Sequence, residues 1–96
     1  MSIAKMQLSL KFGARSPPSG FIKLNSDGSW ISTSGEGGIG VIARNEHGQL
    51  MGGTAKSVTT STALQVELQA ISDGLSLAIS NGWSNVEVES DNQKGR

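Results

Sequence analysis

Residues 21–30 read Phe-Ile-Lys-Leu-Asn-Ser-Asp-Gly-Ser-Trp, and this stretch decides the fold of a chain of 96 residues. Ile22 and Leu24 alternate with polar residues, which is the pattern of a strand with one buried face. The alternation runs into Asp27-Gly28, at or near the end of the expected strand. Asp27 is therefore predicted to be a carboxylate carried by a strand of the core sheet.

An antiparallel meander is predicted from the segments that follow. Ile39, Val41 and Ala43 alternate in a second strand. The run Asn45-Glu46-His47-Gly48 has the composition of a turn, and residues 49–58 can return antiparallel to the second strand. We therefore expect three antiparallel strands joined in chain order.

A helix should come next, because Thr62 and Gln65 have the spacing of a capping box. Asn81-Gly82 predicts where the helix ends, and Trp83 is placed to cover that end. Large and small apolar residues recur at three- and four-residue steps, and we expect the helix to pack on the sheet, with the small residues allowing close approach. The large ones are Leu64, Leu68, Ile71, Leu75 and Ile79, and the small ones are Ala63, Ala70, Gly74 and Ala78.

The last predicted strand is the run Val-Glu-Val-Glu-Ser-Asp at residues 86–91. A strand, a helix and a second strand in succession form a right-handed crossover between parallel strands. The predicted fold class is therefore α/β, with a mixed sheet of three antiparallel strands, one helix and one further parallel strand.

Composition narrows the classes of protein to consider. With 35% hydrophobic residues and no cysteine, the chain fits one small domain without disulfides or cysteine-bound zinc. No apolar run is long enough for a membrane span or a signal peptide, so we expect an intracellular protein without membrane contact. Residues 1–20 are basic and end in Ser-Pro-Pro-Ser-Gly, which predicts a flexible leader or linker; a transit peptide is the less favoured interpretation.

Three motifs are better explained by structure than by chemistry. Gly35, Gly37 and Gly40 spell the dinucleotide-binding pattern, but a strand rather than a helix is predicted after them. These glycines are expected to form a turn and to allow a ligand or neighbouring strand to approach. His47 is predicted to lie on the surface of a turn, and the two tryptophans, which could stack on bases, are expected to pack against the core.

Asp27, Glu67 and Asp91 form the strongest constellation, although each has an ordinary explanation. An Asp-Gly pair can form a turn, an early helical glutamate can favour the helix dipole, and a terminal aspartate can cap the next element. Glu67 is the most informative of the three because its helical neighbours are apolar or small. A carboxylate on such a surface should have a partner.

These residues resemble the plant-type ribonuclease H-like domains, which occur alone and in retroelement-derived reverse transcriptase proteins. The resemblance runs from Pro17 to about Asn92. It includes Pro-Pro-Ser-Gly-Phe-Ile-Lys-Leu-Asn-Ser-Asp-Gly-Ser, then Gly-Gly-Ile-Gly-Val-Ile-Ala-Arg, a Gly-Gly in the third strand, Leu-Gln-Val-Glu-Leu-Gln-Ala and Glu-Ser-Asp. Their order, spacing and predicted placement agree together, so the match is specific.

The resemblance implies a ribonuclease H-like fold and a nuclease that cleaves the RNA strand of RNA–DNA hybrids. Asp27, Glu67 and Asp91 would be the catalytic residues and would hold Mg²⁺, with Mn²⁺ as the alternative ion. Two ions roughly 3.5–4 Å apart would activate a water and stabilise the leaving 3′-oxygen. The RNA strand would be approached by backbone at four further positions, which are Gly28, Ser29, Gly37 and Gly38.

Two departures from the family pattern carry further expectations. Val66 replaces a small alanine before the glutamate. The chain stops at Arg96, so residues 21–96 are interpreted as the N-terminal part of a ribonuclease H-like domain, truncated before its fifth strand and a fourth acidic residue. The strand that carries Asp91 would then be an exposed edge through which copies could associate. A non-catalytic nucleic-acid-binding or interaction module derived from this fold is the alternative function.

Overall fold

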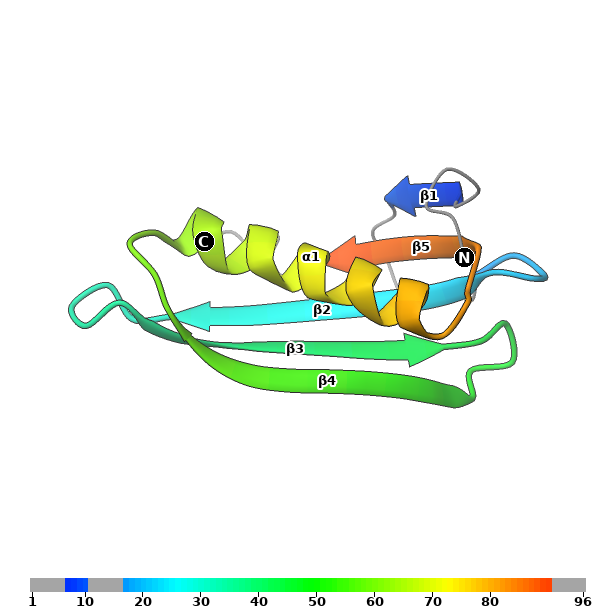
Figure 1. Ribbon diagram of the computed structural model, residues 1–96, viewed down its shortest axis with the longest axis horizontal. Helices are drawn as coiled ribbons and strands as arrows, with labels where there is room; N and C mark the ends of the chain where they lie inside the picture. The colour runs from blue at the N-terminus through cyan, green and yellow to red at the C-terminus, as the bar shows by residue number, and fades with distance from the viewer. Residues whose placement is uncertain (1–6, 11–16, 91–96) are drawn as a thin grey trace.

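One mixed sheet with a helix on one face is formed by residues 7–10 and 17–90, the part of the chain that the computed structural model describes (Figure 1). The strand order is β1-β5-β2-β3-β4. The elements in chain order are β1 (Gln7–Leu10), β2 (Ile22–Trp30), β3 (Glu36–Arg44), β4 (Leu50–Thr59), α1 (Ala63–Ser80) and β5 (Asn85–Ser90).

The predicted α/β sheet is confirmed. β2 pairs antiparallel with β3 and β3 pairs antiparallel with β4, while β5 pairs parallel with β2 after the helical crossover. Ile39, Val41 and Ala43 are all buried, as their alternation predicted. They meet Leu24 of β2 and the valines of β5 in a single core between sheet and helix. β3 also contains Gly37 and Gly40, so no helix follows the glycine motif.

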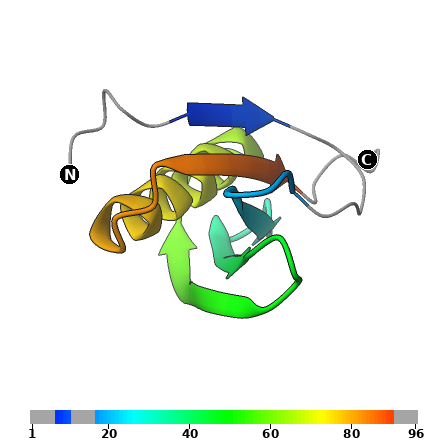
Figure 2. The ribbon, with the colours of Figure 1, turned by 90° about the vertical axis from the view of Figure 1, so that its right-hand side faces the viewer.

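β1 is a strand that the sequence did not predict. It lies within residues 1–20, the expected leader, and pairs parallel with β5, so that Leu8 lies opposite Val86 and Leu10 opposite Val88. Figure 2 shows β1 running beside β5. The predicted exposed edge at β5 is therefore wrong along residues 85–88, because β1 occupies it. The rest of the expected leader, apart from residues 17–20, lies outside the described residues.

The helix packs on the sheet through most of its predicted small residues, and Ile71 and Leu75 of the large series are partly buried against the same core. Val66, Ala70, Gly74 and Ala78 are the buried residues of α1. Three members of the large apolar series are instead exposed, namely Leu64, Leu68 and Ile79. Gly74 faces the sheet directly, since a Cβ added there would lie at van der Waals distance, 3.5 Å, from a Val41 methyl group. No helix in the described part of the chain is both long and apolar enough to cross a membrane.

Both ends of α1 are formed as predicted. The Thr62 side chain accepts a hydrogen bond from Gln65 N, and the Gln65 side chain accepts one from Thr62 N, which completes the capping box. At the other end Gly82 has a φ of 73°, a left-handed conformation that favours glycine. Trp83 N then donates to the Ala78 carbonyl, and the half-buried indole packs against the core.

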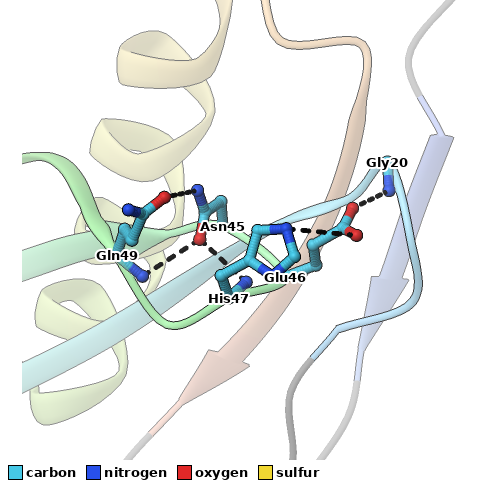
Figure 3. Close-up of polar contacts among 5 residues, drawn as sticks. All are labelled: Gly20, Asn45, Glu46, His47 and Gln49. Carbon is cyan, nitrogen blue, oxygen red and sulfur yellow. Dashed lines mark hydrogen bonds and ion pairs between the residues drawn. The ribbon is translucent and has the colours of Figure 1, made fainter.

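A polar cluster ties the segment before β2 to the turn between β3 and β4 (Figure 3). Gly20 N donates a hydrogen bond of 2.7 Å to Glu46 Oε1. Within the turn, Asn45 Oδ1 accepts hydrogen bonds from His47 N and Gln49 N. His47 is largely exposed, as predicted, and lies beside the Glu46 carboxylate. This cluster therefore holds together the segment before β2 and the turn between β3 and β4, which are far apart in sequence.

The hydrogen bond from Gly20 to Glu46 makes a pH-dependent contribution to stability. The hydrogen bond from the Gly20 backbone, ahead of the influences of Ser19 and His47, holds the pKa of the Glu46 carboxyl below its ordinary value of 4.5. A lowered carboxyl pKa stabilises the fold above the ordinary pKa, and that stabilisation is lost as pH falls through the folded value. On acidification, wild type should therefore lose more unfolding free energy than Glu46→Gln. Urea denaturation at about pH 7 and about pH 3 checks this, and equal losses would contradict it.

Candidate metal and nucleic-acid site

Asp27 lies in β2 with its exposed carboxylate on the face of the sheet away from α1. Its chain neighbours Ser26 and Gly28 alternate to the other face, where Ser26 is buried and Gly28 lies under the helix. The residue opposite Asp27 in the antiparallel pairing is Gly40 of β3. Asp27 therefore stands beside a position that has no side chain, so that a ligand has access to it.

Glu67 extends from the first half of α1 and is half-buried. It directly follows Val66, one of the most fully buried side chains of the core. Val66 fixes this turn of the helix against the sheet, and with it the starting point of the Glu67 side chain. Asp91 lies outside the described residues. The residue before it, Ser90, ends β5 and pairs with Ser26 of β2.

The chain neighbours of the three predicted carboxylates meet in one region. Ser26, which precedes Asp27, pairs with Ser90, which precedes Asp91. Gly28, which follows Asp27, lies directly under Val66, because a Cβ added at Gly28 would be only 2.9 Å from a Val66 methyl carbon. β2 therefore contacts the residue before Asp91 on one side and the residue before Glu67 on the other. The convergence of the three side chains stays a prediction.

The donor set fits a hard divalent cation. Asp27 and Glu67 make no hydrogen bond or ion pair with the described residues, whereas Asp73 and Glu89 are engaged by Lys56 and Lys23 at 3.3 and 2.6 Å. Carboxylate oxygens without other partners are suitable ligands for Mg²⁺. Residues 7–10 and 17–90 contain no group of three or more potential metal-binding side chains, so a three-carboxylate site requires Asp91.

Packing accounts for part of the predicted RNA-binding surface. Ser29 Oγ accepts a hydrogen bond of 3.2 Å from Gly38 N, which joins β2 to β3 on the open face. A Cβ at Gly37 would overlap the carbonyl oxygen of Ser29, so the pairing of these strands itself requires glycine there. Gly28 similarly makes room for Val66. The backbones of these residues are still predicted to face RNA. Gly28 and Gly37, however, are also required to be glycine by the packing of the fold.

Substitutions at Gly28 and Val66 should have strongly coupled effects on stability, because the Val66 side chain occupies the space that a side chain at Gly28 would need. Gly28→Ala adds a methyl group against the Val66 side chain, and we expect the free energy of unfolding to fall by about 1–3 kcal/mol. In the Val66→Ala background the same substitution should cost much less, since the space is then free. Chemical denaturation of the two single variants and the double variant measures the coupling. Additive effects would contradict the contact.

A trough crosses the open face of the sheet next to Asp27. It consists of two adjoining cavities of approximately 620 and 510 Å³ that share Ser29, Gly38 and Ser57. The second cavity reaches Asp27 and Gly40. We call these two cavities together the open-face trough. Sequence reasoning did not assign Gly40 or Ser57 to a site, although Gly40 stood in the glycine motif.

Comparison with known proteins identifies the family. A family model described as reverse transcriptase-like matches residues 25–94, which is more than half of the chain. Among curated proteins, none matches the chain. Solved structures of ribonucleases H1 have a similar fold at 20–24% sequence identity.

Two of these structures illustrate the likeness. RNase H1 from the halophilic archaeon Halobacterium salinarum NRC-1 has 20% identity and a TM-score of 0.69, over 76% of this chain and 55% of that one. LC11-RNase H1, solved in complex with an RNA/DNA hybrid, has 24% identity and a TM-score of 0.64, over 75% of this chain and 55% of that one. The chain thus spans about half the length of the structures that it matches. It has a ribonuclease H-like fold and belongs to the reverse transcriptase-like family.

Proposed function

We propose that this chain provides the catalytic sheet and helix of a divalent-metal-dependent ribonuclease that hydrolyses the RNA strand of RNA–DNA hybrids. The observation that carries the proposal is the meeting of chain neighbours, where Ser26 pairs with Ser90 and Gly28 lies under Val66. Family membership and the hybrid bound by LC11-RNase H1 support it. We also propose, on the motifs quoted above, that the chain comes from the plant-type, retroelement-derived branch, and, on its composition, that it acts inside the cell.

Each predicted residue has a defined task in this proposal. Asp27, Glu67 and Asp91 would hold Mg²⁺, or alternatively Mn²⁺, between β2, α1 and the end of β5. When bound, such ions activate a water and stabilise the leaving 3′-oxygen of a phosphodiester. The chain itself would neutralise the cations with these carboxylates and would orient the RNA strand along four backbone positions, Gly28, Ser29, Gly37 and Gly38. No protein nucleophile is required.

A non-catalytic nucleic-acid-binding module is the second candidate. The observation that favours it is that Asp27 lies on the face of the sheet away from α1, whereas Glu67 extends from that helix. Binding without cleavage would be the expected behaviour of such a module.

A substrate panel separates the two candidates. The protein is incubated with an RNA–DNA hybrid, a DNA duplex and an RNA duplex, with Mg²⁺ and with a chelator, and products are resolved by gel electrophoresis. The nuclease proposal predicts cleavage of the RNA strand of the hybrid only, and only with Mg²⁺. Hybrid binding without cleavage by the folded protein would favour the module, and no binding at all would contradict both.

A further inference from the structure

Lys23 of β2 and Glu89 of β5 form an ion pair that is largely removed from water. Lys23 Nζ lies 2.6 Å from Glu89 Oε1, and the two side chains are 9% and 13% exposed. The ion pair between Lys56 and Asp73, in contrast, has a lysine side chain that is 46% exposed. Solvent screens a buried pair only weakly, so the loss of one partner has a large effect on its surroundings.

The ion pair lies beside the position at which β2 carries Asp27. In the parallel pairing of the two strands, Lys23 lies opposite Glu87, and Asn25 lies opposite Glu89. The pair from Lys23 to Glu89 is therefore diagonal and ends at the level of Asn25. Asp27 is the next residue of β2 on the same face, because alternate residues of a strand share a face.

Burial changes along this face of β2 at the ion pair. Lys23 is buried, whereas Asn25 and Asp27 are exposed. On β5, Glu87 is likewise buried and Glu89 is half-buried. The ion pair thus lies where the buried part of this face meets the open part that carries Asp27. A site at such a boundary depends on the adjacent buried contacts for its geometry.

The end of β5 is supported differently from its beginning. β1 pairs with β5 only along residues 85–88. Among the described strands, the last two residues of β5, Glu89 and Ser90, pair with β2. The ion pair with Lys23 adds a side-chain link to β2 at this point. The link lies two residues before Asp91 in the sequence.

We propose that Lys23 is a positioning residue for the candidate metal site. By holding Glu89 it fixes the end of β5 against β2, and with it the backbone from which Asp91 would reach the ions shared with Asp27. The proposal rests on the proposed function, because it concerns the same metal site. Charge is the competing explanation, since the Glu89 carboxylate attracts a nearby cation whether or not Lys23 holds it.

Two substitutions at Glu89 separate positioning from charge. Glu89→Gln and Glu89→Ala remove the same negative charge, but only glutamine keeps a side-chain oxygen that can accept from the Lys23 ammonium group. Mg²⁺ binding would be followed by NMR at the side-chain carboxyl carbons of Asp27 and Asp91. The titrations would be made at a temperature at which circular dichroism shows each variant to be folded. This measurement requires neither hybrid nor cleavage.

The expected result is a difference between the two variants of equal charge. Glu89→Ala should bind Mg²⁺ at least about tenfold more weakly than Glu89→Gln, the size of effect that residues supporting a metal ligand have. Glu89→Gln should remain within about threefold of wild type, the effect of one lost charge near the site.

Lys23→Met supplies a second test, in which the two explanations predict opposite signs. Removing a positive charge would by itself strengthen Mg²⁺ binding, whereas a displaced β5 end would weaken it. We expect weaker binding. The matched control is Lys56→Met, which removes the lysine of an ion pair between β4 and α1 and should bind Mg²⁺ like wild type.

Each contrary outcome identifies what has failed. A folded wild type whose carboxyl signals do not respond to Mg²⁺ would reject the metal site and the proposed function with it. A wild type that responds, together with equal affinities for Glu89→Gln and Glu89→Ala, would reject positioning alone. Tighter binding by Lys23→Met would show that the lysine acts only through its charge. If Glu89→Ala does not fold, the sign of the change in Lys23→Met decides the question.

Discussion

Asp27→Asn should reduce Mg²⁺-dependent cleavage of an RNA–DNA hybrid by about a thousandfold, without unfolding the protein. A bound metal ion contributes several kcal/mol to phosphodiester hydrolysis, and each 1.4 kcal/mol corresponds to a tenfold change in rate. The Asp27 carboxylate is exposed and unpaired with the described residues. The amide should therefore cost little stability while removing a charged ligand. Single-turnover cleavage at saturating protein measures the effect on chemistry.

A charge-matched control is available in the same chain. Glu46→Gln also exchanges one carboxylate for an amide, but it lies in the turn between β3 and β4, where Gly20 can still donate to the amide oxygen. At neutral pH we expect this variant to cleave like wild type. If Asp27→Asn and Glu46→Gln cleave equally well, Asp27 does not hold a catalytic ion.

Removal of β1 should have the largest effect on stability and association. Four residues of this strand pair with residues 85–88 of β5. Deleting residues 1–10 would leave that edge of β5 unpaired, and we expect the free energy of unfolding to fall by about 2–4 kcal/mol from the lost hydrogen bonds. An open strand edge also favours pairing between chains. Denaturation and analytical ultracentrifugation would report the two effects.

The control for this experiment is deletion of residues 1–6, which keeps β1. That variant should match the full chain in both measurements. A point substitution, Ser9→Pro, tests the same pairing because proline lacks the backbone donor that a strand uses. Should the chain without residues 1–10 be as stable and as monodisperse as wild type, pairing of β1 with β5 would contribute nothing in solution.

Local signals in the sequence were sufficient for the elements that positioned the site. The alternation of Ile39, Val41 and Ala43, the capping box at Thr62 and the stop at Gly82 each concern residues close in sequence, and the structure confirms all of them. Strand, helix and strand then predict a crossover to a parallel strand, while the pairing of β5 with β2 is known only from the structure. This is why Asp27 could be assigned to a strand and Glu67 to the start of the helix, although β2 continues past Asp27 to Trp30 instead of ending near it.

Two features depended on contacts that no local pattern reveals. β1 is a four-residue strand whose partner lies more than seventy residues later, and no turn sequence connects the two. The packed face of α1 was predicted only in part, because Ala70, Gly74 and Ala78 are buried as expected while Leu64 and Leu68 are exposed. Leu64 and Leu68 have the same period as the buried Val66 and Ala70, so periodicity alone could not decide between the two faces.

A titration of Mg²⁺ followed by NMR at the side-chain carboxyl carbons tests the central claim most directly. The claim is that Asp27, Glu67 and Asp91 hold the same cations, as the contacts of their chain neighbours suggest. We predict that all three signals shift together with one apparent affinity, and that Asp27→Asn weakens the response of the other two. If Glu67 or Asp91 stays unchanged while Asp27 responds, or if the substitution leaves their titration unaltered, the shared site is wrong.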